Sequence, residues 1–287
     1  STAGAAGINT AYDIAQKYFI DGGNNRVILA TDGDLNVGLS SESELTRLIE
    51  EKRESGVFLS VLGFGTGNYK DNRLEALADY GNGNYSYIDS EKEAKKVLVD
   101  EMSGTLFTVA KDVKFQLEFN PANVKGYRLI GYENRVMAAE DFNDDTKDAG
   151  EIGAGHSVTV LYEIVLADSK MELGESKLKY ASDSEGVMGD ELLTVNIRYK
   201  EPEGSESKLL TYPVNKSLYS DKMSADMNFA SCVAEFGMLL RNSRYIGDVT
   251  YKDVSAQLSK YDYSDDDYKD EFIYLVNTMK RRDTNFQ

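Results

Sequence analysis

Two oxygen-bearing side chains near the start of the chain have the types and surroundings of metal ligands. Asp32 follows the apolar run Val27–Ala30, with one residue between them, within VILATDGDLN, and Thr2 stands in the Gly/Ala-rich segment STAGAAG. Mg²⁺ prefers oxygen ligands and takes only one or two carboxylates. A hydroxyl and a carboxylate therefore suit a divalent cation, with Asp34 as a secondary contact. The plainer alternatives are a helix N-cap for Thr2 and a loop cap for Asp32.

A parallel sheet would bring both residues to one edge. Three short apolar runs predict buried strands at Val27–Ala30, Val57–Leu62 and Tyr85–Ile88. The segments between them have helical periodicity and predict helices at Ile8–Phe19, from the capping pair Ser41 and Glu44 to a stop at Gly56, at Asn72–Tyr80 and at Glu91–Leu106. Ligands of such sheets bind outside the carboxyl ends of the strands, which is where Asp32 falls. Because three strands are few and the chain starts on a helix, we expect further strands upstream of Ser1.

The pattern changes near residue 111. Alternation of apolar and polar residues predicts five antiparallel strands: Val113–Phe119, Tyr127–Tyr132, Val158–Val165, Leu192–Tyr199 and Leu209–Val214. Helical periodicity then returns and predicts three helices, Ala225–Leu240, Tyr251–Leu258 and Asp266–Met279. The predicted fold class is therefore α/β plus β. It comprises a partial Rossmann-like domain (1–110) with helices on both sheet faces, an antiparallel β-sandwich (111–220), and C-terminal helices (221–287) packed on either of them.

The charge, the cysteine count and the apolar runs of the chain limit its partners, disulfides and membrane segments. The formal net charge of −17 disfavours nucleic acid and anionic membranes as partners. Cys232 is the only cysteine, so no intramolecular disulfide can form. No apolar run approaches the roughly 20 residues that a transmembrane helix needs.

An acidic segment offers a second, weaker metal candidate. Asp141, Asn143 and Asp145 occupy positions 1, 3 and 5 of an EF-hand-like calcium loop. Thr146, however, stands where such a loop needs glycine, and Ile152 stands where it needs the bidentate glutamate. An acidic solvated turn is the plainer interpretation.

The segment STAGAAGI followed by VILATDGDLNVG resembles the von Willebrand factor type A domain. That family builds a metal ion-dependent adhesion site from an Asp-x-Ser-x-Ser loop, a threonine and an aspartate. The resemblance implies that Thr2 and Asp32 are metal ligands and that the cation is Mg²⁺, or else Mn²⁺ or Ca²⁺. Because the Asp-x-Ser-x-Ser element would precede Ser1, the N-terminal part of the domain is expected to be missing here. Metal binding is therefore expected of the intact protein and not necessarily of this fragment.

The segments TLFTVAKDVKFQLEFNPANVKGYRLIGYENR and DFNDDTKDAGEIGAGHSVTVLYEIV resemble a bacterial subfamily with a C-terminal domain of unknown function. The resemblance implies an exported or lipid-anchored envelope protein, periplasmic or extracellular. The leading hypothesis is a non-enzymatic adhesion or assembly module whose protein partner presents a carboxylate to the cation. The alternatives are a metal-assisted hydrolase using Asp32 and Asp34, and a structural scaffold with an incomplete metal site. A homodimer, or a retained N-terminal piece, is expected to cover the exposed sheet edge.

Overall fold

The computed structural model describes residues 4–32, 42–65, 71–101, 104, 107–132, 135–147, 149–173, 189–202 and 204–286. Contacts divide the chain into two compact units, each made of several segments. The first contains 1–116, 138–157 and 196–210, and the second contains 117–137, 158–195 and 211–287. The predicted domain limits at residues 110 and 220 stay predictions.

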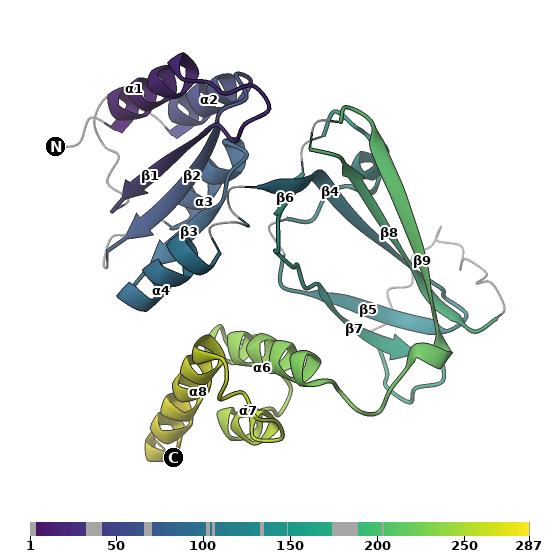
Figure 1. Ribbon diagram of the computed structural model, residues 1–287. Helices are drawn as coiled ribbons and strands as arrows, with labels where there is room; N and C mark the ends of the chain where they lie inside the picture. Colours follow the sequence, from purple (N-terminus) through teal and green to yellow (C-terminus); the bar gives the residue numbers. More distant parts are fainter. Residues whose placement is uncertain are drawn as a thin grey trace. The chain divides into compact units, whose positions relative to one another are not determined.

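The first unit contains the predicted parallel sheet. Its strands β1 (Arg26–Thr31), β2 (Phe58–Phe64) and β3 (Tyr85–Ile88) lie in that order and pair in parallel (Figure 1). Helices α1 (Gly4–Lys17), α2 (Glu42–Arg53) and α3 (Asp71–Tyr80) bury one apolar cluster with the sheet: Ile8, Tyr12, Val27, Leu45, Ile49, Val57, Leu59, Val61, Leu74, Leu77 and Ala78. The alternation of side chains along β2 places Leu59 and Val61 on this face.

The opposite face of the sheet meets a shorter helical segment. Leu62 and Ile88 cluster there with Val97, which follows α4 (Glu91–Lys95) in the π-helical turn η1 (Lys96–Asp100). The Ser90 hydroxyl caps α4 by accepting a hydrogen bond from the Glu93 backbone N–H (3.1 Å), as the sequence Ser-x-x-Glu predicts. The helix was predicted to reach Leu106. Helix α4 ends at Lys95 and continues as the π-helical turn η1 to Asp100; Gly104 is again helical, and 102–103 and 105–106 lie outside the described residues.

The antiparallel strands form two sheets. Their strands are β4 (Thr108–Phe119), β5 (Val124–Ile130), β6 (Gly150–Gly153), β7 (Leu161–Leu166), β8 (Glu191–Lys200) and β9 (Ser207–Asn215). The larger sheet has the strand order β6-β4-β8-β9, and the smaller sheet pairs β5 with β7 antiparallel. Within the second unit, Phe119 at the end of β4 stacks on Tyr127 of β5, with ring centroids 4.0 Å apart. Short 3-10 turns are η2 (Ala139–Asn143) and η3 (Lys216–Leu218). The mixed α/β fold with parallel and antiparallel sheets is thus confirmed.

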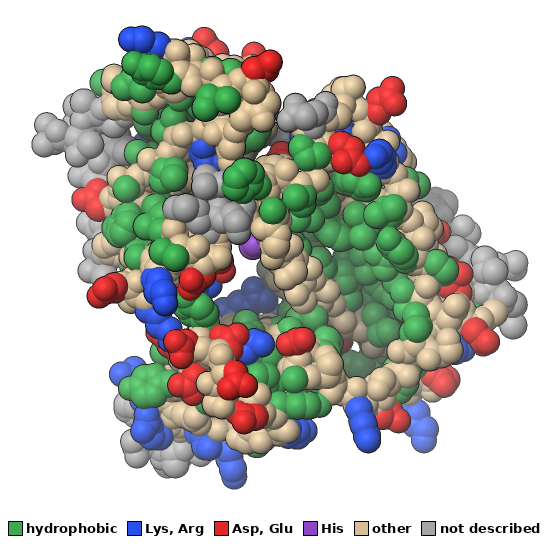
Figure 2. All heavy atoms as spheres, in the orientation of Figure 1, with side chains coloured by type: hydrophobic (Ala, Val, Ile, Leu, Met, Phe, Trp, Pro, Cys, Tyr) green, Lys and Arg blue, Asp and Glu red, His purple; other side chains and the backbone are tan. Residues whose placement is uncertain are grey.

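Strand β6 was not predicted, because its sequence GEIG has no apolar alternation to detect. Strand β9 keeps Leu209, Leu210 and Tyr212 exposed, at 53%, 39% and 51%. Figure 2 shows hydrophobic side chains gathered over this part of the sheet. An exposed apolar area of this kind on an edge strand is typical of contact surfaces.

The first two C-terminal helices have their predicted bounds, whereas the third, predicted to end at Met279, continues to Phe286. The three helices are α6 (Ala225–Leu240), α7 (Tyr251–Leu258) and α8 (Asp267–Phe286), and their shared core consists of Cys232, Phe236, Val254, Leu258, Tyr263 and Val276. A reciprocal capping box between Thr250 and Asp253 starts α7. Burial raises the pKa of the Cys232 thiol to about 11, so this thiol is a packing group and not a nucleophile. Within the described ranges, no helix is long and apolar enough to cross a membrane.

Two glycines with opposite surroundings test how closely the turn between α3 and β3 packs against β2, with Gly83 in that turn and Gly7 in α1 as the comparison. A Cβ at Gly83 would lie 1.8 Å from the Leu59 carbonyl oxygen, whereas a Cβ at Gly7 would meet nothing within 4 Å. We expect Gly83→Ala to lower the free energy of unfolding by about 2 kcal/mol or more, because backbone must move. Gly7→Ala should raise it by roughly 0.5–1 kcal/mol, because alanine favours helix. Urea unfolding, monitored by circular dichroism, measures the free energy of unfolding of each variant. Equal changes in this free energy in the two variants would contradict the packing.

Candidate functional site

The carboxyl edge of the parallel sheet carries the candidate ligand Asp32. This exposed residue directly follows β1. Gly65, which follows β2, lies beside it: a Cβ at Gly65 would be 3.8 Å from the Asp32 Cβ. The Tyr87 hydroxyl of β3 donates a hydrogen bond to the Gly65 carbonyl oxygen. The three strand ends thus converge at one edge, which is where parallel α/β sheets bind ligands.

The rest of the predicted metal set cannot be placed. Thr2 and Asp34 lie outside the described residues. In the parts of the chain that are described, no group of three or more His, Cys, Asp or Glu side chains could hold a metal ion. Asp32 is an exposed carboxylate with room beside a glycine, so it fits the role of one ligand. Metal binding at this edge stays a prediction.

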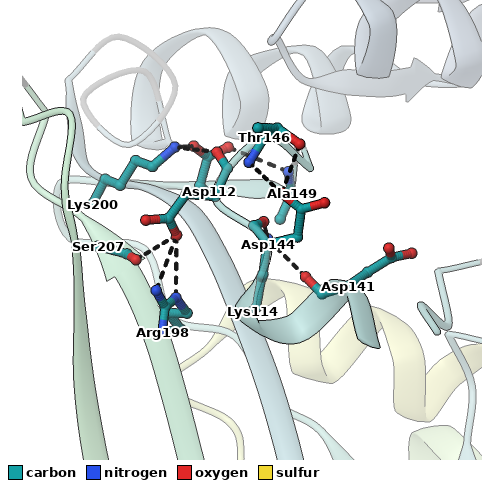
Figure 3. A network of polar contacts seen from close by, with 10 residues as sticks. Asp112, Lys114, Asp141, Asp144, Thr146, Ala149, Arg198, Lys200 and Ser207 are labelled. Carbon is teal, nitrogen blue, oxygen red and sulfur yellow. Dashed lines mark hydrogen bonds and ion pairs between the residues drawn. The ribbon is translucent and has the colours of Figure 1, made fainter. Parts of the chain in front are cut away.

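A buried lysine organises the acidic segment around η2. Lys114 on β4 is only 3% exposed, and its ammonium donates hydrogen bonds to the carbonyl oxygens of Asp141 (3.1 Å) and Asp144 (Figure 3). A buried ammonium is costly unless its donors find acceptors. The backbone of the acidic segment supplies these acceptors.

The carboxylates of this segment bond to nearby donors (Figure 3). Asp145 accepts hydrogen bonds from the Ser207 hydroxyl (2.5 Å) and from Arg198 Nε (3.2 Å). Asp144 accepts them from the Thr146 hydroxyl (2.6 Å) and backbone N–H (2.9 Å). The Ser207 hydroxyl and the Arg198 guanidinium lower the pKa of the Asp145 carboxyl, and the Thr146 hydroxyl and N–H lower that of Asp144. Both carboxylates are therefore held in the charged form.

Two of the three candidate calcium ligands lie against cationic side chains. Asp141 is 3.7 Å from the Lys147 ammonium, Asp145 bonds to Arg198, and Asn143 is exposed. Lysine and arginine groups thus lie against oxygens that a calcium ion would need. Calcium binding by Asp141, Asn143 and Asp145 stays a prediction, and any ion would compete with these cationic side chains.

A further ion pair joins β4 to β8. The Lys200 ammonium lies 2.6 Å from Asp112 Oδ2 and also donates to the Asp145 carbonyl oxygen (2.9 Å). The sequence patterns did not indicate Lys114, Arg198 and Lys200 as members of this network. The available signal was spacing: Asp112 and Lys114 are two residues apart on β4, as are Arg198 and Lys200 on β8, so each pair shares a strand face.

Comparison with known sequences places the chain in a family. Residues 104–281 match the family described as "Uncharacterized protein YfbK, C-terminal". The chain belongs to the YfbK family. "Uncharacterized protein YfbK" of Escherichia coli (strain K12) is 45% identical over 281 residues, which cover 96% of this chain and 48% of that protein. The chain therefore spans about half the length of this relative.

Two solved structures are similar in fold to this YfbK-family chain. A von Willebrand factor type A protein from Catenulispora acidiphila has a TM-score of 0.35 and 14% identity, over 86% of this chain and 56% of that one. The human COPII-coat protein Sec24c has a TM-score of 0.38 and 12% identity, over 87% of this chain and 33% of that one. At these TM-scores neither similarity indicates what the chain binds.

The depressed pKa of Asp145 predicts a specific response to acid. A carboxyl with a lowered folded-state pKa stabilises the protein above its unfolded-state pKa, and loses this contribution as the pH falls through the folded-state value. We expect Asp145→Asn to lower Tm at neutral pH, and this difference from the wild type to shrink below about pH 4.

The control is Asp21→Asn, since Asp21 is exposed in the turn after α1. Thermal unfolding of both variants between pH 3 and 7 gives the comparison. A Tm difference for Asp145→Asn that is independent of pH would contradict the assigned charge.

Proposed function

We propose that the chain is a protein-interaction module of the YfbK family that binds a divalent cation at the carboxyl edge of its parallel sheet. The observation that carries this proposal is the exposed Asp32 carboxylate at the converging ends of β1, β2 and β3, beside the side-chain-free Gly65. A carboxylate that protrudes from a strand end can reach an ion without burying its charge.

Asp32 would contribute one oxygen ligand, and the Thr2 hydroxyl would contribute another. Gly65 leaves space next to Asp32 that a side chain would fill. When bound, the cation supplies a positive charge that attracts a carboxylate of the partner protein.

Charge supports a cation as the link. The exposed Asp32 carboxylate would repel an acidic partner group that approaches the sheet edge, and a cation between the two carboxylates would remove that repulsion. We propose binding as the function; the hydrolase alternative would use Asp32 and Asp34, and Asp34, like Thr2, lies outside the described residues. Adhesion or assembly at the bacterial envelope, which the resemblance to A-domain proteins implies, belongs to the same proposal.

The test is isothermal titration of the chain with Mn²⁺ and Mg²⁺, comparing wild type with Asp32→Ala. We expect one saturable site in the wild type, and a rise in Kd of about tenfold or more on loss of the carboxylate.

The matched control is Asp21→Ala, which removes an exposed carboxylate from the turn after α1. It should leave the titration unchanged. Metal binding that survives in Asp32→Ala would remove Asp32 from the site, and a wild-type chain that binds neither ion would refute the proposal for this chain.

A further inference from the structure

Strand β4 is interrupted by an extra residue where it pairs with β6. Ala110 pairs with Ile152 and Val113 pairs with Gly150, so Lys111 and Asp112 together oppose the single residue Glu151. This two-against-one pairing is a β-bulge, which redirects side chains and often lies next to functional sites. Asp112 also has a positive φ of 52°. Non-glycine residues rarely adopt this conformation, and such strain concentrates at binding sites.

The bulge brings neighbouring side chains to one place. In a regular strand Lys111 and Asp112 would point to opposite faces. Here both line an open depression of about 420 Å³, whose lining also includes Glu151, Lys200, Gly204 and Ser205. This volume lies in the range of small-molecule sites. The lining also includes Asn82, in the turn after α3, and the other residues belong to β6, β4, β8 and the loop that follows β8.

Charges in the depression are unequally compensated. Asp112 pairs with Lys200 at 2.6 Å. The Glu151 carboxylate interacts electrostatically with the Arg26 guanidinium. Desolvation by burial lowers the pKa of Arg26, and the negative charge of Glu151 raises it in part. Lys111 has no hydrogen bond or ion pair with any residue that the structure describes. One cation therefore faces the depression without a partner, in a chain of net charge −17.

We propose that the depression at the β4 bulge binds a small oxyanion, a phosphate, sulfate or carboxylate group, through the Lys111 ammonium. The hydroxyl of Ser205 lines the same space and provides an additional donor, whereas the Gly204 N–H is already donated to the Glu201 carbonyl oxygen (2.9 Å). Lys200 contributes positive charge while remaining paired with Asp112. This site does not involve Asp32 and does not depend on the proposed cation site.

The experiment titrates the chain with inorganic phosphate and follows binding by calorimetry and by line broadening in ³¹P NMR, with NaCl at matched ionic strength as reference. We expect saturable binding in the wild type and a Kd about tenfold or more higher in Lys111→Met, as for loss of a charged hydrogen bond. Lys111→Arg keeps the charge and should stay within about threefold of the wild type.

Two control variants test whether phosphate binding is specific to Lys111. One removes another exposed lysine, and the other alters the proposed cation site. Lys170→Met removes an exposed lysine far along the sequence and should bind phosphate as the wild type does, as should Asp32→Ala. Circular dichroism confirms that Lys111→Met is folded, as expected for a side chain without partners. Unchanged phosphate affinity in Lys111→Met, or a wild-type response no larger than that to NaCl, would overturn the proposal.

Discussion

An ammonium group buried in a sheet must find hydrogen-bond acceptors, and the polar end of the larger sheet is built around this requirement. Lys114 reaches the carbonyl oxygens of Asp141 and Asp144, which fixes the backbone of the segment after η2. The fixed backbone then presents Asp145 to Arg198 and Ser207, and its carbonyl oxygen to Lys200. Each later contact depends on the first, because an unsatisfied buried lysine would cost several kcal/mol.

Periodicity alone was enough to find most elements. Strand β3 and helices α6 and α7 have their predicted bounds, because buried apolar runs and capping residues mark both of their ends. Strand β6 escaped detection because a four-residue strand with two glycines has no period. The end of α4 was misplaced because the apolar positions continue through η1, so the change from α-helical to π-helical hydrogen bonding leaves the side-chain pattern intact.

The candidate sites were less accessible to sequence reasoning. Asp32 could be singled out, since a polar residue at the end of an apolar strand is visible in the sequence. Lys114 could not, because a lysine at a polar position of an alternating strand is ordinarily solvated, and only the fold shows it to be buried. The bulge at Lys111 and Asp112 depends on pairing register, which two strands distant in the sequence set between them and which neither strand encodes alone.

Both proposed sites lie where a strand stops being regular, one at a strand end and one at a bulge. Taken alone, the net charge of −17 favours the cation site over the anion site. At physiological ionic strength, however, exposed charges are largely screened beyond about 8 Å, so a ligand responds mainly to the groups that it touches. At Asp32 these include an exposed carboxylate, and at the bulge they include the Lys111 ammonium and the Asp112 carboxylate, which is already paired with Lys200. Opposite ligand preferences within one acidic chain are therefore compatible, because each is decided by its nearest side chains.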